Sequence, residues 1–275
     1  MTPLIITAAI CGAEITRKES PYLPITAEEL AEEAWKCQEA GAAIIHLHVR
    51  DDQGEPTQDI EVFRRAVTAM KARGVTAIIQ PSTGGAVGMT AEERMQPVFL
   101  NPEMASLDCG TLNFGESYFV NDFPMMRAFA AEMKARKVMP ELECFEGGHI
   151  ANALKLRDEG LLPDHLHFNL VLGVPGAMAA SVKNLLFMVE LLPPGASWTV
   201  SAVGRHQLPL DLATLALGGH IRVGMEDNIY LSKGVLSEGN APFVRRIAGY
   251  AADLGRPLAT PGEVRHILSL RQESL

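Results

Sequence analysis

The sequence predicts a (β/α)8 barrel, the TIM-barrel fold, built as one domain over residues 1–275. Short apolar runs alternate with amphipathic helical stretches from end to end, and eight such pairs can be counted. No low-complexity segment and no long Ser/Gly linker interrupts the chain. The alternative is a doubly wound open sheet, which usually has fewer strands or an additional domain.

Each expected strand is a short run of apolar residues, and each expected helix repeats its apolar residues with helical spacing. The first helix, beginning near residue 26, has a capping box made by Thr26 and Glu29. The expected strands are 4–10, 42–48, 76–80, 104–108, 138–143, 165–171, 197–202 and 219–223. The further helices are 59–73, 90–99, 122–136, 148–160, 178–191, 208–217 and 239–254.

Composition argues against two classes of main partner. The net charge of −9 at pH 7 and the pI near 5.4 argue against nucleic acid and anionic membrane as main partners. Residues 1–10 are apolar, but they lack a basic region and are too short to span a bilayer, so a first strand is expected there. Four scattered cysteines without CxxC spacing favour a reduced, cytoplasmic setting.

The second expected strand ends in two histidines, His46 and His48. Side chains at positions i and i+2 of a strand point the same way, so both rings face one volume. At the carboxyl end of a barrel strand, this pair predicts two of three protein ligands of a catalytic metal. A hydrogen-bonded packing pair is the alternative. The second such pair, His165 and His167, opens its strand, and we therefore expect it at the opposite, stabilising end of the barrel.

The eighth expected strand is followed by Arg222, Glu226 and Asp227. Strands 2 and 8 lie two places apart in a closed barrel, a separation of about 10 Å. A carboxylate from strand 8 can therefore reach the same metal as two imidazoles from strand 2, with bonds of ~2 Å. Two imidazoles and one carboxylate suit zinc, with iron(II) or manganese as alternatives. Otherwise, Glu226 and Asp227 cap the loop and pair with Arg222.

The third expected strand runs into a loop of small residues, 82–88. Accessible backbone N–H groups and the hydroxyls of Ser82 and Thr83 would make a cradle for a carboxylate or a phosphate. No lysine follows, so this is not a phosphate loop of the GxxxxGK[ST] type. A plain tight loop is the alternative.

Further polar residues are expected at the same end of the barrel. Ser106 and Asp108 share one face of the fourth strand, Glu141 and Glu143 share one face of the fifth, and Glu14 follows the first. Buried carboxylates are costly unless they pair with a metal, an arginine or a cationic ligand. Arginines expected as structural partners for some of them are Arg17, Arg50 and Arg205.

A series of segments along the whole chain resembles the β-keto acid cleavage enzyme family. The matching segments are residues 7–14, 45–50, 82–86, 110–114, 171–176, 218–222, 226–229 and, more weakly, 254–260. The resemblance implies a zinc-dependent TIM barrel. Its reaction would convert a β-keto acid and acetyl-CoA into acetoacetate and a new acyl-CoA.

The resemblance also implies roles for individual residues. His46, His48 and Glu226 would bind zinc, Asp227 would be the general base, and Arg222 would orient it and stabilise negative charge. The remaining substrate-binding assignments are Ser82, Gly85 and Ser106 for the carboxylate, Glu14 for a cationic group at the far end, and Glu143 for the pocket wall. Asp108 departs from the family pattern, which has an amide there, and Ser106 replaces a threonine. An extra carboxylate favours a cationic ligand or requires a local partner.

The implied mechanism is a retro-Claisen cleavage. Zinc would polarise the 3-keto group while Asp227 removes a proton from C2, and the enolate would attack acetyl-CoA. The released thiolate would then add to the ketone and expel acetoacetate. No nucleophilic cysteine is needed. The substrate would be an amino-bearing or quaternary-ammonium β-keto acid such as 3-keto-5-aminohexanoate, and the protein a homo-oligomer, a tetramer.

Two other functions compete with this interpretation. Metal-dependent hydrolases of the amidohydrolase type also use a His-x-His pair, but on strand 1, with further ligands on strands 4 to 6. Here the pair lies on strand 2, and His149 is the one histidine expected near the top of those later strands. A non-catalytic protein that binds a metal or acyl-CoA is the other alternative.

Overall fold

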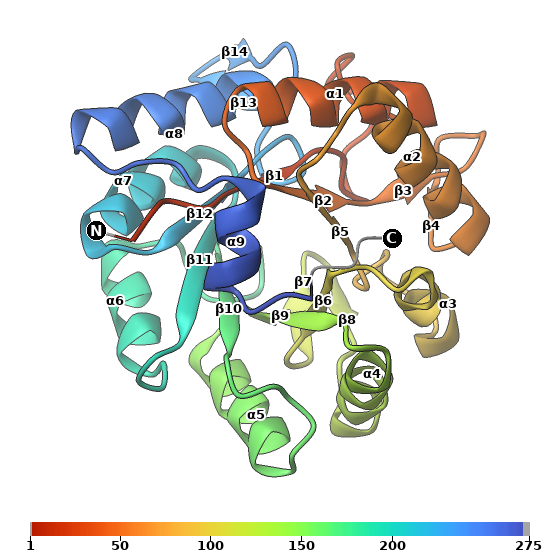
Figure 1. Cartoon of the computed structure of the whole chain (residues 1–275), viewed down its shortest axis with the longest axis vertical. Coiled ribbons are helices and arrows are strands. Elements are labelled where there is room, and N and C mark those ends of the chain that lie inside the picture. Colours follow the sequence, from red (N-terminus) through yellow and green to blue (C-terminus); the bar gives the residue numbers. More distant parts are fainter. Residues whose placement is uncertain (1, 272–275) are drawn as a thin grey trace.

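The computed structural model describes residues 2–271, in which eight parallel strands form a barrel (Figure 1). The hydrogen-bonded order is β5-β2-β1-β12-β11-β10-β9-β6. Between the two end strands, the hydroxyl of Thr83 donates to the carbonyl of Ser106 at 2.7 Å. The strands are β1 (Ile6–Ala9), β2 (Ile44–Leu47), β5 (Ile78–Pro81), β6 (Met104–Asp108), β9 (Met139–Cys144), β10 (His167–Leu172), β11 (Ser197–Ala202) and β12 (His220–Val223). The predicted (β/α)8 barrel is confirmed.

Helices surround the barrel (Figure 1). The predicted capping box forms: the Thr26 hydroxyl accepts from the backbone N–H of Glu29 at 3.2 Å, and the Glu29 carboxylate accepts from that of Thr26 at 3.0 Å. The helices are α1 (Ala27–Glu39), α2 (Ile60–Arg73), α3 (Ala91–Met95), the 3-10 turn η1 (Gln96–Leu100), α4 (Phe123–Arg136), α5 (Gly147–Asp158), α6 (Val182–Glu190), the 3-10 turn η2 (Gly204–His206), α7 (Gln207–Leu217) and α8 (Ala241–Asp253). The helix expected from residue 178 begins only at Val182, because Ser181 caps it by accepting from the N–H of Asn184.

The sequence did not predict the last helix or three short hairpins. Helix α9 (Pro261–Ile267) lies across one end of the barrel, where Val264 and Leu268 pack with Ile44 and Ile78 (Figure 1). It closes the end at which the strands begin. The hairpins are β3 (Val49–Arg50) with β4 (Pro56–Thr57), β7 (Leu112–Phe114) with β8 (Ser117–Phe119), and β13 (Tyr230–Ser232) with β14 (Val235–Leu236). They follow β2, β6 and β12, so they surround the other end.

Large apolar side chains lie mainly between the barrel and its helices, whereas many buried polar side chains lie inside the barrel. Large apolar side chains such as Phe63, Phe129 and Phe243 are fully buried between the barrel and its helices. Inside the barrel, buried polar side chains such as Asn169 and Ser201 stand above the apolar end. Among residues 2–271, no helix has both the length and the apolarity that a membrane crossing requires.

The second His-x-His pair lies where β10 begins, as expected, with His167 as its first residue and His165 two residues before it. His165 Nε2 and His167 Nδ1 both contact the hydroxyl of Ser197, at 2.9 and 2.8 Å. His167 Nε2 lies 3.3 Å from a carboxylate oxygen of Glu141 inside the barrel. This pair is a hydrogen-bonded structural cluster.

Candidate active site

A cavity of about 500 Å³ opens where the barrel strands end. The predicted site residues that line it are Glu14, His46, His48, Ser82, Gly85, Asp108, Glu143, Arg222, Glu226 and Asp227. Ser106 is the one predicted site residue that is not among the lining residues. An apolar part of the wall, which the sequence did not predict, includes Phe114, Phe119, Phe145, Val171 and Val174.

The side chains of His46, His48 and Glu226 converge into a group that could hold a metal ion. The Nε2 atoms of His46 and His48 each lie 3.6 Å from Oε1 of Glu226. Tetrahedral coordination with bonds of about 2.1 Å requires ligand atoms about 3.4 Å apart, close to what these residues provide. The other oxygen of Glu226, Oε2, is buried without a hydrogen-bond partner within the described chain. The donor set and its spacing therefore fit a divalent cation such as zinc.

The local backbone carries Glu226 to the histidines. Its N–H donates to the carbonyl of Ala9 at the end of β1, at 3.2 Å. Gly224 has a φ of 145°, and a Cβ there would lie 2.2 Å from that same carbonyl oxygen. Asn240 holds the loop from outside by accepting from the N–H of Met225 at 2.7 Å. A glycine is thus required where the loop crosses the end of β1.

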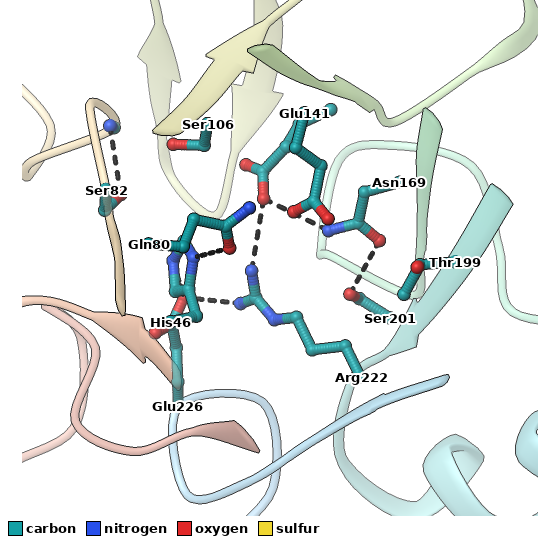
Figure 2. A network of polar contacts seen from close by, with 12 residues as sticks. His46, Gln80, Ser82, Ser106, Glu141, Asn169, Thr199, Ser201, Arg222 and Glu226 are labelled. Carbon is teal, nitrogen blue, oxygen red and sulfur yellow. Dashed lines mark hydrogen bonds and ion pairs between the residues drawn. The ribbon is translucent and has the colours of Figure 1, made fainter. Parts of the chain in front are cut away.

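Gln80 fixes the orientation and the tautomer of His46 (Figure 2). The side-chain carbonyl of Gln80 accepts from Nδ1 of His46 at 2.8 Å, which leaves Nε2 unprotonated and directed at Glu226. Burial, reinforced by the Arg222 cation, lowers the pKa of His46 to about 4. At neutral pH the ring is therefore uncharged, as a metal ligand must be.

Replacing Gln80 with methionine is expected to weaken metal binding by roughly 10- to 100-fold, because the imidazole loses its orienting partner. The dissociation constant for zinc, measured by competition with a chromophoric chelator, checks this. Gln53→Met, at an exposed position between β3 and β4, is the matched control and should bind zinc as the wild type does. An unchanged constant for the Gln80 variant would contradict the orienting role.

Arg222 connects the carboxylates of the site, and Figure 2 shows it beside Glu226. Its Nε and Nη2 donate to the two oxygens of Asp227, both at 2.9 Å, and Nη2 also contacts Glu226. Its Nη1 donates to Glu143 at 3.1 Å, and Asn169 donates to the same Glu143 oxygen. The Glu226 oxygen that faces the two histidines, Oε1, is therefore also the oxygen that pairs with Arg222.

Burial affects the acids of this network differently. It raises the pKa of Asp227 to about 6, although Arg222 opposes the rise. Burial and the neighbouring Asp108 raise the pKa of Glu143 well above its usual range. For Glu226, burial is outweighed by Arg222 and the two histidines, which hold the pKa well below its usual range. Asp227 thus has a pKa suited to proton transfer near neutral pH.

The loop after β5 lines the cavity with Ser82, Gly84 and Gly85, whereas the hydroxyl of Thr83, an expected donor, instead donates to the carbonyl of Ser106 at 2.7 Å. Ser82 lines the cavity and its hydroxyl accepts from the N–H of Gly84 at 3.1 Å. Ser106 lies behind the loop, fully buried, where its hydroxyl accepts from the N–H of Thr83 at 3.0 Å. The structure therefore places Ser106 as a support of the loop.

The arginines expected to pair with site carboxylates have other partners. Arg17 pairs with Glu29, so the expectation that it pairs with a site carboxylate such as Glu14 is wrong. Arg50 donates to the carbonyls of Gly12 and Ile15, at 2.9 and 2.7 Å, and so holds the segment that carries Glu14. Glu14 is exposed at the cavity wall.

The family model of the β-keto acid cleavage enzymes matches residues 3–270. The chain belongs to the β-keto acid cleavage enzyme family. This membership confirms the resemblance seen in the sequence, and it argues against a hydrolase of the amidohydrolase type. In this family member the His-x-His pair lies at the end of the second barrel strand in sequence order, with His46 in β2 and His48 directly after it.

This chain aligns with two known enzymes over nearly the whole length of both proteins. It is 50% identical to the 3-keto-5-aminohexanoate cleavage enzyme of Fusobacterium nucleatum, over 99% of this chain and 100% of that protein. It is 37% identical to the 3-oxoadipate:acetyl-CoA acetyltransferase of Cupriavidus necator, over 98% and 95% of the two chains. The structure of ObcA with oxaloacetate has the same fold, with a TM-score of 0.79, 24% identity, and coverage of 91% of this chain and 68% of that one.

Proposed function

We propose that this enzyme is a zinc-dependent transferase that converts a β-keto acid and acetyl-CoA into acetoacetate and a new acyl-CoA. The observation that carries the proposal is the ligand set of His46, His48 and Glu226 directly beside Asp227, within one cavity. Acetyl-CoA as the second substrate is supported by the name of the C. necator relative. When bound, the metal supplies a Lewis acid that polarises the keto group and stabilises the enolate.

Asp227 is the proposed base. Its carboxylate takes a proton from C2 of the β-keto acid, and the C2 carbanion forms a bond to the acetyl carbon as the thioester C–S bond breaks. The CoA thiolate then adds to the original keto carbon, and the C2–C3 bond breaks. Protonated Asp227 returns its proton to C2, so acetoacetate leaves and no net proton is consumed. Arg222, with two hydrogen bonds to Asp227, fixes the direction of that carboxylate.

The cradle at Ser82 and Gly85 is proposed to hold the substrate carboxylate, with Ser106 supporting the loop from behind. The Ser82 hydroxyl and the Gly85 backbone can donate hydrogen bonds to a carboxylate. No additional cation is then needed to bind the substrate carboxylate in a site that already holds several charges. Glu143, fixed by Arg222 and Asn169, forms part of the cavity wall, with a carboxylate oxygen within 4.8 Å of a ring nitrogen of His46. The binding energy of the carboxylate would thus orient C2 toward Asp227.

A cationic β-keto acid, 3-keto-5-aminohexanoate or one of similar charge, is the proposed substrate. Glu14 and Glu116 add exposed carboxylates to the cavity wall, and Arg222 is the one arginine or lysine among the described lining residues. The enzyme from F. nucleatum that shares 50% identity is named for this substrate. We assign the recognition of the cationic group to Glu14.

Replacing Glu14 with glutamine is expected to raise KM for a cationic β-keto acid by about tenfold, because one charged hydrogen bond is lost. KM for a neutral β-keto acid of equal length should stay unchanged. Steady-state kinetics on both substrates checks this, with Glu28→Gln, exposed on α1, as the matched control. Equal changes of KM for the two substrates would show that Glu14 does not recognise the cationic group.

The proposed function is tested by assaying the zinc-loaded protein for acetoacetate and new acyl-CoA. Cationic, neutral and anionic β-keto acids are each supplied with acetyl-CoA. Both products should form in equal amounts, fastest with the cationic acid. A zinc-loaded protein that is inert toward the whole panel would favour a non-catalytic role in binding metal or acyl-CoA.

We also propose that the protein is a homotetramer located in the cytoplasm. Val182, Leu186, Phe187 and Leu191 expose apolar surface at α6, as expected where another subunit packs. The four free, buried cysteines agree with a reducing compartment. Light scattering coupled to size exclusion measures the assembly, and a monomeric mass would exclude the tetramer.

A further inference from the structure

Arg94 is a buried cation just behind the cavity. It belongs to α3, which follows the cradle loop, and it is only 2% exposed. Its Nε donates to the carbonyl of Thr83 and its Nη1 to that of Val120, both at 2.9 Å. Its Nη2 donates to Asp108 at 3.1 Å and to the side-chain carbonyl of Asn121 at 2.6 Å. One guanidinium therefore joins the cradle loop, strand β6 and the segment after the β7–β8 hairpin.

Asp108 lies between Arg94 and the substrate space. It lines the cavity, and one of its oxygens would be 3.7 Å from a Cβ placed on Gly84 in the cradle. Burial raises the pKa of Asp108, and the Arg94 cation opposes that rise. A carboxylate left unpaired here would repel a substrate carboxylate seated in the same loop. An uncompensated buried charge is also strongly unfavourable in itself.

We propose that Arg94 is a positioning residue for the substrate carboxylate, acting by fixing the Thr83 backbone and by compensating the charge of Asp108. It does not line the cavity, so it acts through these two groups and not by contact with substrate. The inference rests on the proposed function, because the cradle is assigned there to the carboxylate.

The shape of the guanidinium explains why an arginine occupies this position. Its planar fork reaches Thr83, Val120 and Asp108 in three directions at once, and it stacks over the Phe119 ring at 4.3 Å. A lysine would supply the charge as a point but could not hold all three directions. The loop geometry and the charge compensation can therefore be separated by substitution.

The test compares Arg94→Met, Arg94→Lys and the double variant Arg94→Met/Asp108→Asn with the wild type. Arg94→Met should raise KM for the β-keto acid more than about tenfold, while kcat changes less than about threefold. The double variant should recover a large part of that loss, because the unpaired charge is gone. Arg94→Lys, which retains the charge, should fall between Arg94→Met and wild type. Arg65→Met, at an exposed position on α2, is the control and should leave KM unchanged.

Two outcomes would overturn the proposal. One is an unchanged KM in Arg94→Met, whether or not kcat falls, and the other is no recovery of KM in the double variant. KM for acetyl-CoA and the zinc content separate a local effect from general damage, and both should match the wild type. If Arg94→Met does not fold, the neutral pair Arg94→Gln and Arg94→Gln/Asp108→Asn provides the same comparison. A wild type that cleaves no β-keto acid would refute the proposed function itself, whereas active wild type with unaffected Arg94 variants would refute this inference alone.

Discussion

Replacing His46 with alanine is expected to remove the metal and to lower turnover by about a thousandfold or more. The substitution takes one of three ligands, and the remaining His48 and Glu226 cannot complete a tetrahedral site. Lewis-acid stabilisation of the enolate is worth several kcal/mol, and each 1.4 kcal/mol is a tenfold change. Elemental analysis of the dialysed protein gives zinc per chain, and kcat is measured on the same sample.

The chain provides its own control for this experiment. His165 has the same His-x-His spacing but lies at the opposite end of the barrel, in contact with Ser197. His165→Ala should keep its zinc and its turnover. A His46→Ala protein that retains one zinc per chain would contradict the ligand assignment, and zinc loss without loss of turnover would contradict the role of the metal.

Replacing Asp227 with asparagine is expected to lower kcat by about 10²- to 10⁴-fold while zinc remains bound, the range typical of general acid–base catalysis. Asparagine has nearly the same shape and can still accept one hydrogen bond from Arg222, but it cannot take the proton from C2. Steady-state kinetics, zinc content and exchange of the C2 proton with deuterated water check the three parts of this claim.

Asp164→Asn, at an exposed position before β10, is the matched control and should behave as wild type. Turnover that persists in Asp227→Asn would remove this residue as the base. A variant that loses zinc would show that Asp227 supports the ligands instead. Loss of kcat with retained C2 exchange would move the role of Asp227 to a later step.

The barrel and the convergence of the proposed metal ligands could be predicted because they depend on regular geometry. The two-residue period of a strand puts His46 and His48 on one face, and barrel closure brings the residues after β12 close to β2. The structure has their Nε2 atoms at equal distances from Glu226. Position within a strand likewise separated this pair from His165 and His167.

Contacts between distant side chains could not be predicted in this way. Arg94 looks like an ordinary charged residue of a helical stretch, and nothing local shows that its guanidinium turns inward to Asp108. The contact of Gln80 with His46 depends on the register between β2 and β5, where the two residues are paired. Ser106 shares a strand face with Asp108, but the Thr83 backbone lies in front of it.

The missed elements have physical reasons too. Helix α9 is short and covers an apolar barrel end that is known only once the strands are assembled. The hairpin strands are two or three residues long, too short for an alternating pattern to be visible. These segments are stabilised by tertiary contacts, so their own sequences contain little information that predicts a helix or a strand.

The central claim is that acetyl-CoA supplies two carbons of acetoacetate and the β-keto acid supplies the other two. Acetyl-CoA labelled with ¹³C at the thioester carbonyl, given to the zinc-loaded enzyme with an unlabelled β-keto acid, tests it directly by NMR. The account predicts that all of the label appears at C3 of acetoacetate and none in the new acyl-CoA. Label recovered as free acetate, or as an acetyl group exchanged without acetoacetate formation, would contradict it.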